Sequence, residues 1–263
     1  MNTIGRVRSL WRYPVKSMRG EMLPRAFLGF SGVYGDRVYA FRASTAQKGF
    51  PFLTARQLPA LLLHRADYRH PGIMAQPPNL EEAVQLAPGA TPLYAEPIEA
   101  LVDVHTPAGA VFGVDDAALV RLLHDAAPDS GDITLLRSDR AFTDCRPLSL
   151  ISMQTVEQLG RELGVELDAR RFRANMYVDF DAGQGFQENE WVGRRLRIGD
   201  TAEFAVMGRD PRCKMITLDP DTGEAMPDLM RRVAGAHDGT AGVYAAVLVE
   251  GSVSPGDPVS RLD

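Results

Sequence analysis

Short runs of strand-forming residues, separated by glycine and proline, constrain the fold of this 263-residue chain most strongly. Residues 37–42 alternate with the two-residue period of a strand, and a Gly-Asp turn predicts a hairpin further along the chain. The pattern predicts strands at residues 4–15, 37–42, 100–106, 110–114, 172–180, 195–198, 202–207 and 243–250. Residues 64–100, rich in Pro, Gly and Ala, are predicted to form a surface connection with short strands.

Three segments have the apolar spacing of short helices, and we expect helices at residues 115–126, 152–163 and 227–236. Asp115 is the predicted N-cap of the first, and Gly164 suits the end of the second because glycine readily takes the left-handed conformation. The sequence contains no Gly-x-Gly-x-x-Gly or Walker A motif, which disfavours a common nucleotide-binding fold. An α+β protein dominated by small, curved sheets is expected, with a boundary between two parts near residues 125–140.

Charge and cysteine content exclude several classes of protein. The formal net charge of −5 disfavours nonspecific binding of nucleic acid, which needs many cations against phosphates. Cys145 and Cys213 fit no CxxC pattern, so a zinc site made of thiolates alone is excluded, although a single disulfide stays open. The first residues have no uninterrupted apolar stretch typical of a secretory signal, and no apolar run approaches the roughly 20 residues of a spanning helix. We therefore expect a cytoplasmic protein with no integral membrane segment.

Residues 211–223, Pro-Arg-Cys-Lys-Met-Ile-Thr-Leu-Asp-Pro-Asp-Thr-Gly, are the most informative segment for chemistry. Cys213 stands between Arg212 and Lys214, whose positive charges favour its thiolate. A thiolate is what a soft metal or a sulfur-transfer reaction requires. The competing interpretation is a free cysteine at a strand end, followed by an ordinary turn. For Cys145 we expect a buried structural residue.

Other cationic segments have two interpretations each. Lys16 and Ser17 offer an ammonium, a hydroxyl and backbone amides to a phosphate, or form a solvated loop. Arg37 could contact a phosphate or form a surface ion pair. Arg173 and Asn175 would share one face of a predicted strand and need polar partners there. A cofactor rich in phosphate and heterocyclic nitrogen could supply these partners, and so could a neighbouring carboxylate.

Taken in order, these segments resemble the MOSC superfamily (molybdenum cofactor sulfurase C-terminal domain). Tyr-Pro-Val-Lys-Ser and Gly-Asp-Arg precede the Arg-Cys and Asp-Pro-Asp-Thr-Gly segments, as in its two-part members. Over nearly its full length the chain is similar to the mitochondrial amidoxime-reducing component and its bacterial relatives. The resemblance implies a MOSC N-terminal β-barrel-like domain over residues 1–125. A MOSC domain over residues 126–263, a β-barrel with a few helices, would follow it.

The resemblance also implies a binding site for the molybdenum cofactor (Mo-molybdopterin). Cys213 is expected to be the protein's ligand to molybdenum, at the catalytic centre. Lys16 and Ser17 match the pair that binds the phosphate end of the pterin, and Arg212 should lie beside the metal. The full set of residues expected to bind the cofactor is Lys16, Ser17, Arg37, Asp144, Ser152, Arg173, Asn175 and Arg212.

The function implied is a molybdenum-cofactor-dependent reductase of N-hydroxylated substrates such as amidoximes and hydroxylamines. The chain has no cysteines for an iron–sulfur cluster, so we expect a separate electron-donor protein of ferredoxin, flavin or haem type. We also expect no membrane-anchoring N-terminus. One alternative is a carrier of the cofactor or its sulfur that uses a Cys213 persulfide. Another is a structural or interaction module without a cofactor.

Overall fold

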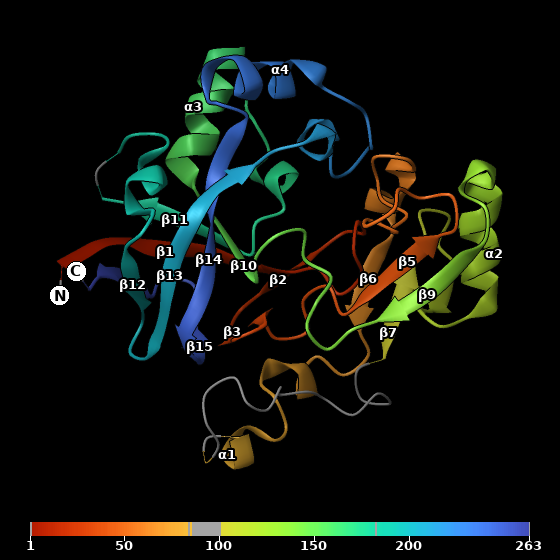
Figure 1. The fold of residues 1–263 in the computed structure, drawn as a ribbon, viewed down its shortest axis with the longest axis horizontal. Coiled ribbons are helices and arrows are strands. Elements are labelled where there is room, and N and C mark those ends of the chain that lie inside the picture. The colour runs from red at the N-terminus through yellow and green to blue at the C-terminus, as the bar shows by residue number, and fades with distance from the viewer. Residues whose placement is uncertain (1, 84, 86–100, 182, 263) are drawn as a thin grey trace.

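The computed structural model describes residues 2–83, 85, 101–181 and 183–262, and its largest sheet contains a closed barrel of seven strands (Figure 1). Barrel strands follow the order β11-β10-β14-β13-β12-β16-β1, and β1 closes the ring by pairing with β11. β2 extends the sheet from β1. The bounds are β1 Asn2–Arg12, β2 Glu21–Leu23, β10 Leu148–Ser152, β11 Met176–Phe180, β12 Arg195–Ile198, β13 Ala202–Pro211, β14 Thr240–Val249 and β16 Pro258–Arg261.

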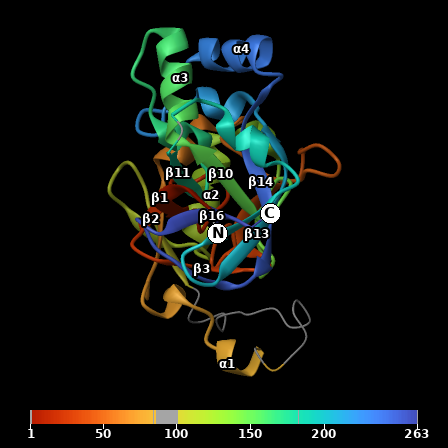
Figure 2. The same cartoon turned by 90° about the vertical axis from the view of Figure 1, so that its left-hand side faces the viewer.

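β1 is the first strand of the chain, yet it lies in the same barrel as the last strands. It pairs with β16 on one side and with β11 on the other. A Cβ atom at Gly5 would lie 2.2 Å from the carbonyl oxygen of Asp179, so glycine is required where β1 and β11 approach each other. Because Asn2 on β1 pairs with Arg261 on β16, the first and last described strands lie side by side (Figures 1 and 2). The predicted domain division between residues 125 and 126 stays a prediction.

Apolar side chains, which alternate with more polar ones along the strands, fill the interior of the barrel. On β13, Ala202, Phe204 and Val206 are buried, whereas Glu203 and Met207 on the other face are more exposed. A strand places successive side chains on opposite faces, so this pattern supplies one apolar face to the core. Burial of a side chain such as Phe204 stabilises the fold by about 1.5–3 kcal/mol.

A second part of the molecule packs around its own apolar core (Figure 1). It consists of two small antiparallel sheets and the helix α2, and a third small sheet joins it to the barrel region through β15. The bounds are β3 Ala26–Gly29, β4 Gly32–Val33, β5 Tyr39–Ala43, β6 Arg65–Tyr68, β7 Val102–His105, β8 Val111–Gly113, α1 Leu80–Ala83, α2 Ala117–Ala126, β9 Ile133–Arg137 and β15 Gly251–Val253.

Two helices, α3 (Met153–Leu163) and α4 (Pro227–Ala236), pack together beside the barrel and bury a third apolar cluster (Figure 2). α3 begins directly after β10, where the side chain of Ser152 accepts a hydrogen bond from the Thr155 amide. It ends at Gly164, which has a φ of 69°. The short 3-10 turns are η1 Pro59–Leu63, η2 Ile73–Ala75, η3 Pro128–Ser130, η4 Ala169–Phe172, η5 Gln187–Trp191 and η6 Lys214–Thr217.

Most of the predicted elements are confirmed. The hairpins β7–β8 and β12–β13 and the helices α2, α3 and α4 lie where the sequence predicts them, except that the N-cap of α2 is Asp116 instead of Asp115. The predicted connection over residues 64–100 contains β6 and α1, while residues 84 and 86–100 lie outside the described residues. Within the described chain, no helix is long and apolar enough to cross a membrane.

One strand prediction is wrong at its start. The segment predicted as a strand from residue 172 to 180 begins as the end of η4, and β11 starts only at Met176. Arg173 lies between them with a φ of 51°, in the left-handed region. A left-handed residue cannot continue a strand, so the two-residue alternation assumed for Arg173 and Asn175 does not apply.

Candidate functional site

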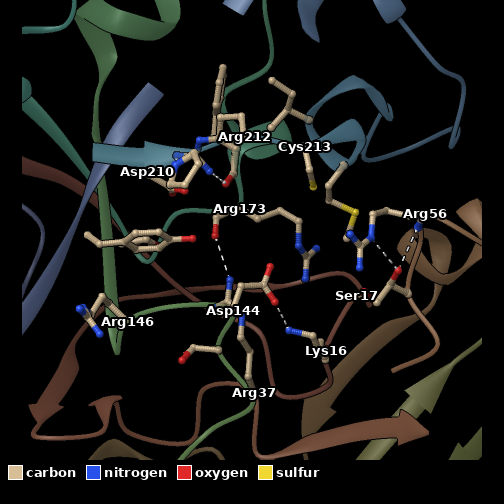
Figure 3. Close-up of a pocket in the computed structure, with 18 of the residues that line it drawn as sticks. Lys16, Ser17, Arg37, Arg56, Asp144, Arg146, Arg173, Asp210, Arg212 and Cys213 are labelled. Carbon is tan, nitrogen blue, oxygen red and sulfur yellow. Dashed lines mark hydrogen bonds and ion pairs between the residues drawn. The ribbon is translucent and has the colours of Figure 1, made fainter. Parts of the chain in front are cut away.

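A cavity of about 820 Å³, partly open to solvent, is lined by the barrel, by the segment after β1 and by the segment before β10. Figure 3 shows these side chains converging from several elements. Eight of the nine predicted site residues line it: Lys16, Ser17, Arg37, Asp144, Arg173, Asn175, Arg212 and Cys213.

Ser152 does not line this cavity. Its hydroxyl donates a hydrogen bond of 2.7 Å to the buried carboxylate of Glu188, and it also caps α3. Thr155 donates to the same carboxylate. These contacts use the polar atoms of Ser152 to join α3 to η5. The structure therefore separates this residue from the other eight.

The cavity is strongly cationic although the chain as a whole is acidic. Seven of its lining side chains are positively charged and two are carboxylates. This local excess suits an anionic ligand. The seven cations are Lys16, Arg37, Arg56, Arg146, Arg171, Arg173 and Arg212.

Four of these cations have a carboxylate partner. Arg37 pairs with the buried Asp36, Lys16 with Asp144, Arg171 with Asp219 and Arg212 with Asp210. Arg56, Arg146 and Arg173 form no such ion pair among the described residues.

Arg173 is the most deeply buried of the three unpaired cations, with 9% of its surface exposed. Its Nη2 atom has no hydrogen-bond partner within the described chain. The guanidinium lies 4.3 Å from the centre of the Tyr13 ring. Burial lowers the pKa of Arg173 to about 10, so the group remains charged at neutral pH. A buried, charged donor without a partner favours a bound anion at this position.

Three cavity residues have a left-handed backbone although none is glycine. Ser17, Arg37 and Arg173 have φ values of 67°, 48° and 51°. Such conformations cost free energy and persist only when surrounding contacts enforce them, which happens most often at functional sites. Arg37 supplies one such contact, because its Nη2 atom donates to the carbonyl oxygen of Arg173 at 3.1 Å.

Lys16 is held on the wall of the cavity. Its Nζ atom donates to the Asp144 carboxylate and to the carbonyl oxygen of Phe142, the latter at 2.8 Å. Burial lowers the pKa of Lys16, and the charge of Asp144 opposes this effect. Burial alone would raise the pKa of Asp144, but the charge and hydrogen bond of Lys16 bring it below its usual value. Asp144 therefore serves as the counter-ion of Lys16.

Asn175 joins two barrel strands at the cavity. Its side-chain oxygen accepts a hydrogen bond of 3.1 Å from the Ser149 hydroxyl, and its amide donates to the carbonyl oxygen of Trp11 at 3.3 Å. Because both ends of the amide are bound to protein, Asn175 positions the cavity wall.

Cys213 follows β13 and directly precedes η6, with its side chain exposed. In Figure 3 its sulfur points into the space shared by Arg56 and Arg173. Among the described residues no three His, Cys, Asp or Glu side chains gather as a metal site. Cys213 lines the cavity, and a cysteine thiolate is a type of side chain that can bind a soft metal.

The backbone before Cys213 is fixed by Arg212. Its Nε atom donates to the carbonyl oxygen of Ala241 at 2.6 Å, and Nη1 donates to that of Phe172 at 2.9 Å. These bonds join the end of β13 to β14 and η4.

Sequence reasoning missed several cavity residues. Arg56, Arg146, Arg171, Asp210 and Tyr244 line the cavity, yet they belong to none of the predicted site residues. Arg146 lies only two residues beyond Asp144, a proximity that could have indicated it. Isolated arginines such as Arg56 have no sequence pattern of their own. Cys145 was predicted to be buried, and this was wrong, because it lies in an exposed segment.

Two domain families match successive parts of the chain. Residues 4–94 match the MOSC N-terminal beta barrel domain, and residues 137–260 match the MOSC domain. The chain is 24% identical to rat mitochondrial amidoxime reducing component 2, over all of this chain and 85% of that protein. It is 32% identical to the molybdenum cofactor sulfurase of Drosophila grimshawi, over 43% of this chain and 15% of that protein.

Among solved structures, the YuaD protein of Bacillus subtilis is similar, with a TM-score of 0.46 and 12% identity over 97% of this chain and 93% of that one. The two domain matches follow each other along the sequence and together include every residue named above that lines the cavity. The chain therefore belongs to the MOSC-domain proteins in which a MOSC N-terminal beta barrel domain precedes the MOSC domain.

Proposed function

We propose that this chain is a molybdenum-cofactor-dependent oxidoreductase that reduces N-hydroxylated compounds such as amidoximes and hydroxylamines. One observation carries the proposal: an exposed thiol, Cys213, and an unpaired buried cation, Arg173, line the same cavity. A thiolate suits a soft metal and the cation suits an anionic group, and the molybdenum cofactor contains both a metal and a phosphate. Relatives named amidoxime reducing component, similar over the whole chain, support the substrate class.

The chain's own residues would divide the work of holding the cofactor. Cys213 would ligate the molybdenum, and Arg173 would donate hydrogen bonds to an anionic part of the cofactor. Ser17 is buried and lines the same cavity. Lys16 and Arg37 keep their carboxylate partners and add positive potential from the wall. When bound, the cofactor would supply the redox chemistry, while the protein supplies orientation and electrostatics.

The proposal requires an electron donor, for which we expect a separate protein of ferredoxin, flavin or haem type. A cytoplasmic location, expected from the sequence, also belongs to the proposal.

A sulfur or cofactor carrier is the second candidate. The exposed Cys213 thiol favours it, because a persulfide can form only on an accessible sulfur. The similarity of the MOSC half to molybdenum cofactor sulfurase supports this candidate as well.

Cysteine variants test the proposal, because the chain offers a matched control. Both cysteines are free and exposed, but only Cys213 lines the cavity. Wild type, Cys213→Ala and Cys145→Ala would be produced with molybdate in a host that makes the cofactor. Molybdenum, pterin and the reduction of benzamidoxime by reduced viologen would then be measured. We expect about one molybdenum per chain and reduction in wild type and Cys145→Ala, and loss of both in Cys213→Ala.

The other outcomes separate the alternatives. One added sulfur on Cys213 by mass spectrometry, without benzamidoxime reduction, would favour the carrier. Wild type that binds neither molybdenum nor pterin, under conditions that load a known relative, would contradict both and leave an interaction module. An Arg173→Gln variant that keeps its full pterin content would contradict the role given to Arg173.

A further inference from the structure

The three cavity cations without a carboxylate partner among the described residues differ in how deeply they are buried. Arg173 is buried, Arg56 is half-buried and Arg146 is exposed. Because Arg173 is assigned to the cofactor and Figure 3 shows Arg146 across the cavity, Arg56 is the unpaired cation beside Cys213 that remains for a second ligand nearer to solvent. We propose that Arg56 binds a carboxylate on the substrate, so that this protein acts on N-hydroxylated compounds that also carry an acid group. The inference rests on the proposed function and specifies its substrate class.

Arg56 is held in place before any ligand arrives. Its Nε atom donates a hydrogen bond of 3.3 Å to the Thr54 hydroxyl oxygen, and Thr54 in turn donates to Gln57. The guanidinium lies 4.6 Å from the centre of the Phe50 ring. These two contacts use Nε and one face of the guanidinium, and leave both Nη atoms available. An arginine already held in one orientation loses little entropy when it binds a carboxylate through two parallel hydrogen bonds.

The direction of the side chain fits this role. Figure 3 shows the Arg56 guanidinium extending into the space beneath Cys213, opposite the guanidinium of Arg173. Two like charges that face the same space repel each other unless an anion lies between or beside them. A substrate carboxylate on Arg56 would lie within the same cavity as Cys213, where the proposed reduction takes place.

No described carboxylate neutralises Arg56. Asp144 is close enough for Arg56 to contribute to its lowered pKa, but the hydrogen bond of Asp144 goes to Lys16. A second cation lies beside Arg56, because Lys214 donates from Nζ to the backbone oxygen of Arg56 at 3.4 Å. The surroundings of Arg56 thus retain a positive potential that favours an anionic ligand.

Aromatic rings beside Arg56 indicate what the rest of the substrate is like. Phe50 packs edge-on against Phe52 with ring centres 5.1 Å apart, and Phe52 packs against Phe142 at 5.4 Å. Phe50 also lines the cavity. An apolar wall next to an arginine is suited to an aromatic or aliphatic carboxylic acid.

The test compares two probes in the same loaded protein: benzamidoxime, which is neutral, and 4-carboxybenzamidoxime, which is an anion. The readout is the ratio of kcat/KM for the acid to kcat/KM for the neutral probe, in wild type, Arg56→Gln, Arg56→Lys and Arg146→Gln. Arg121→Gln, an exposed arginine on α2 away from the cavity, is the matched control. We expect a ratio of about ten in wild type and Arg121→Gln, falling to about one in Arg56→Gln, because hydrogen bonds to charged groups contribute about 1.5–3 kcal/mol.

Arg56→Lys should retain part of the preference, because a lysine keeps the charge but loses the two-bond geometry. Arg146→Gln should reduce the ratio less than Arg56→Gln, since Figure 3 shows Arg146 across the cavity from Arg56 and an exposed charge is screened by salt. Equal ratios in wild type and Arg56→Gln, with both probes reduced, would overturn the inference and leave the proposed function intact.

If neither probe is reduced, the proposed function fails, and direct binding measurements then test the carboxylate site. Isothermal titration calorimetry would measure the binding of 4-carbamoylbenzoate and of benzamide to the same samples. Tighter binding of the acid to wild type than to Arg56→Gln would support the carboxylate site. Equal binding to both proteins would overturn it.

Discussion

The guanidinium of Arg212 lies 2.8 Å from the carboxylate of Asp210, and both side chains are almost fully buried beside Cys213. Burial raises the pKa of Asp210, while the charge of Arg212 opposes that rise. The pair thus fixes the end of β13 just before the residue that we propose as the metal ligand. Removing either partner would leave the other buried without a counter-charge.

Asp210→Asn should destabilise the fold by about 3 kcal/mol, since it leaves Arg212 as an unpaired buried cation. Urea unfolding of the purified protein would measure the change. Asp238→Asn is the matched control, because it breaks an ion pair with Arg209, the residue next to Asp210 on β13, that is exposed, at 86% for the aspartate. Equal losses in the two variants would contradict the role of burial.

Asp144→Asn should lower the pKa of Lys16 further. Burial already lowers it, and Asp144 is the group that acts in the opposite direction. With that carboxylate gone, the neutral amine should dominate at a lower pH than in wild type. The chain has three lysines, so NMR of ¹³C-methylated lysine could follow each one, with the exposed Lys48 and Lys214 as internal references. An unchanged or higher Lys16 pKa would be inconsistent with the pairing.

Ser17→Gly should raise the free energy of unfolding by about 0.5–1 kcal/mol, because glycine adopts a φ of 67° without the cost that serine incurs. Ser17→Ala keeps the strained backbone and should show no such gain. Both variants lose the hydroxyl, so under the proposed function both should retain less pterin than wild type. A stabilised alanine variant would show that backbone strain at this position is not the cause.

Ser152→Ala should destabilise the protein by about 1–2 kcal/mol, because it removes the cap of α3 and a hydrogen bond to the buried Glu188. The molybdenum content of the folded protein should stay the same, since Ser152 does not line the cavity. Chemical unfolding and metal analysis on one preparation would measure both. Loss of metal without loss of stability would restore the sequence-based expectation that Ser152 binds the cofactor.

Individual helices and hairpins could be predicted because the residues that determine them are close together in the sequence. Gly164 ends α3 through its own left-handed backbone, and the hairpin of β12 and β13 follows from a turn between two apolar runs. The segment around Cys213 was recognisable because its charged neighbours are adjacent in sequence. These features depend on residues within a few positions of one another.

Tertiary structure alone decided the barrel closure and the composition of the cavity. β1 meets β11 and β16 from more than 150 residues away, a pairing for which the sequence has no local pattern. Arg173 departs from the predicted strand because contacts with Arg37 and Tyr13 hold it in a left-handed turn. Sequence alone thus determined which residues could carry the chemistry. Folding decided which of the cations kept a carboxylate partner, because ion pairs depend on distances between segments that only the folded chain brings together.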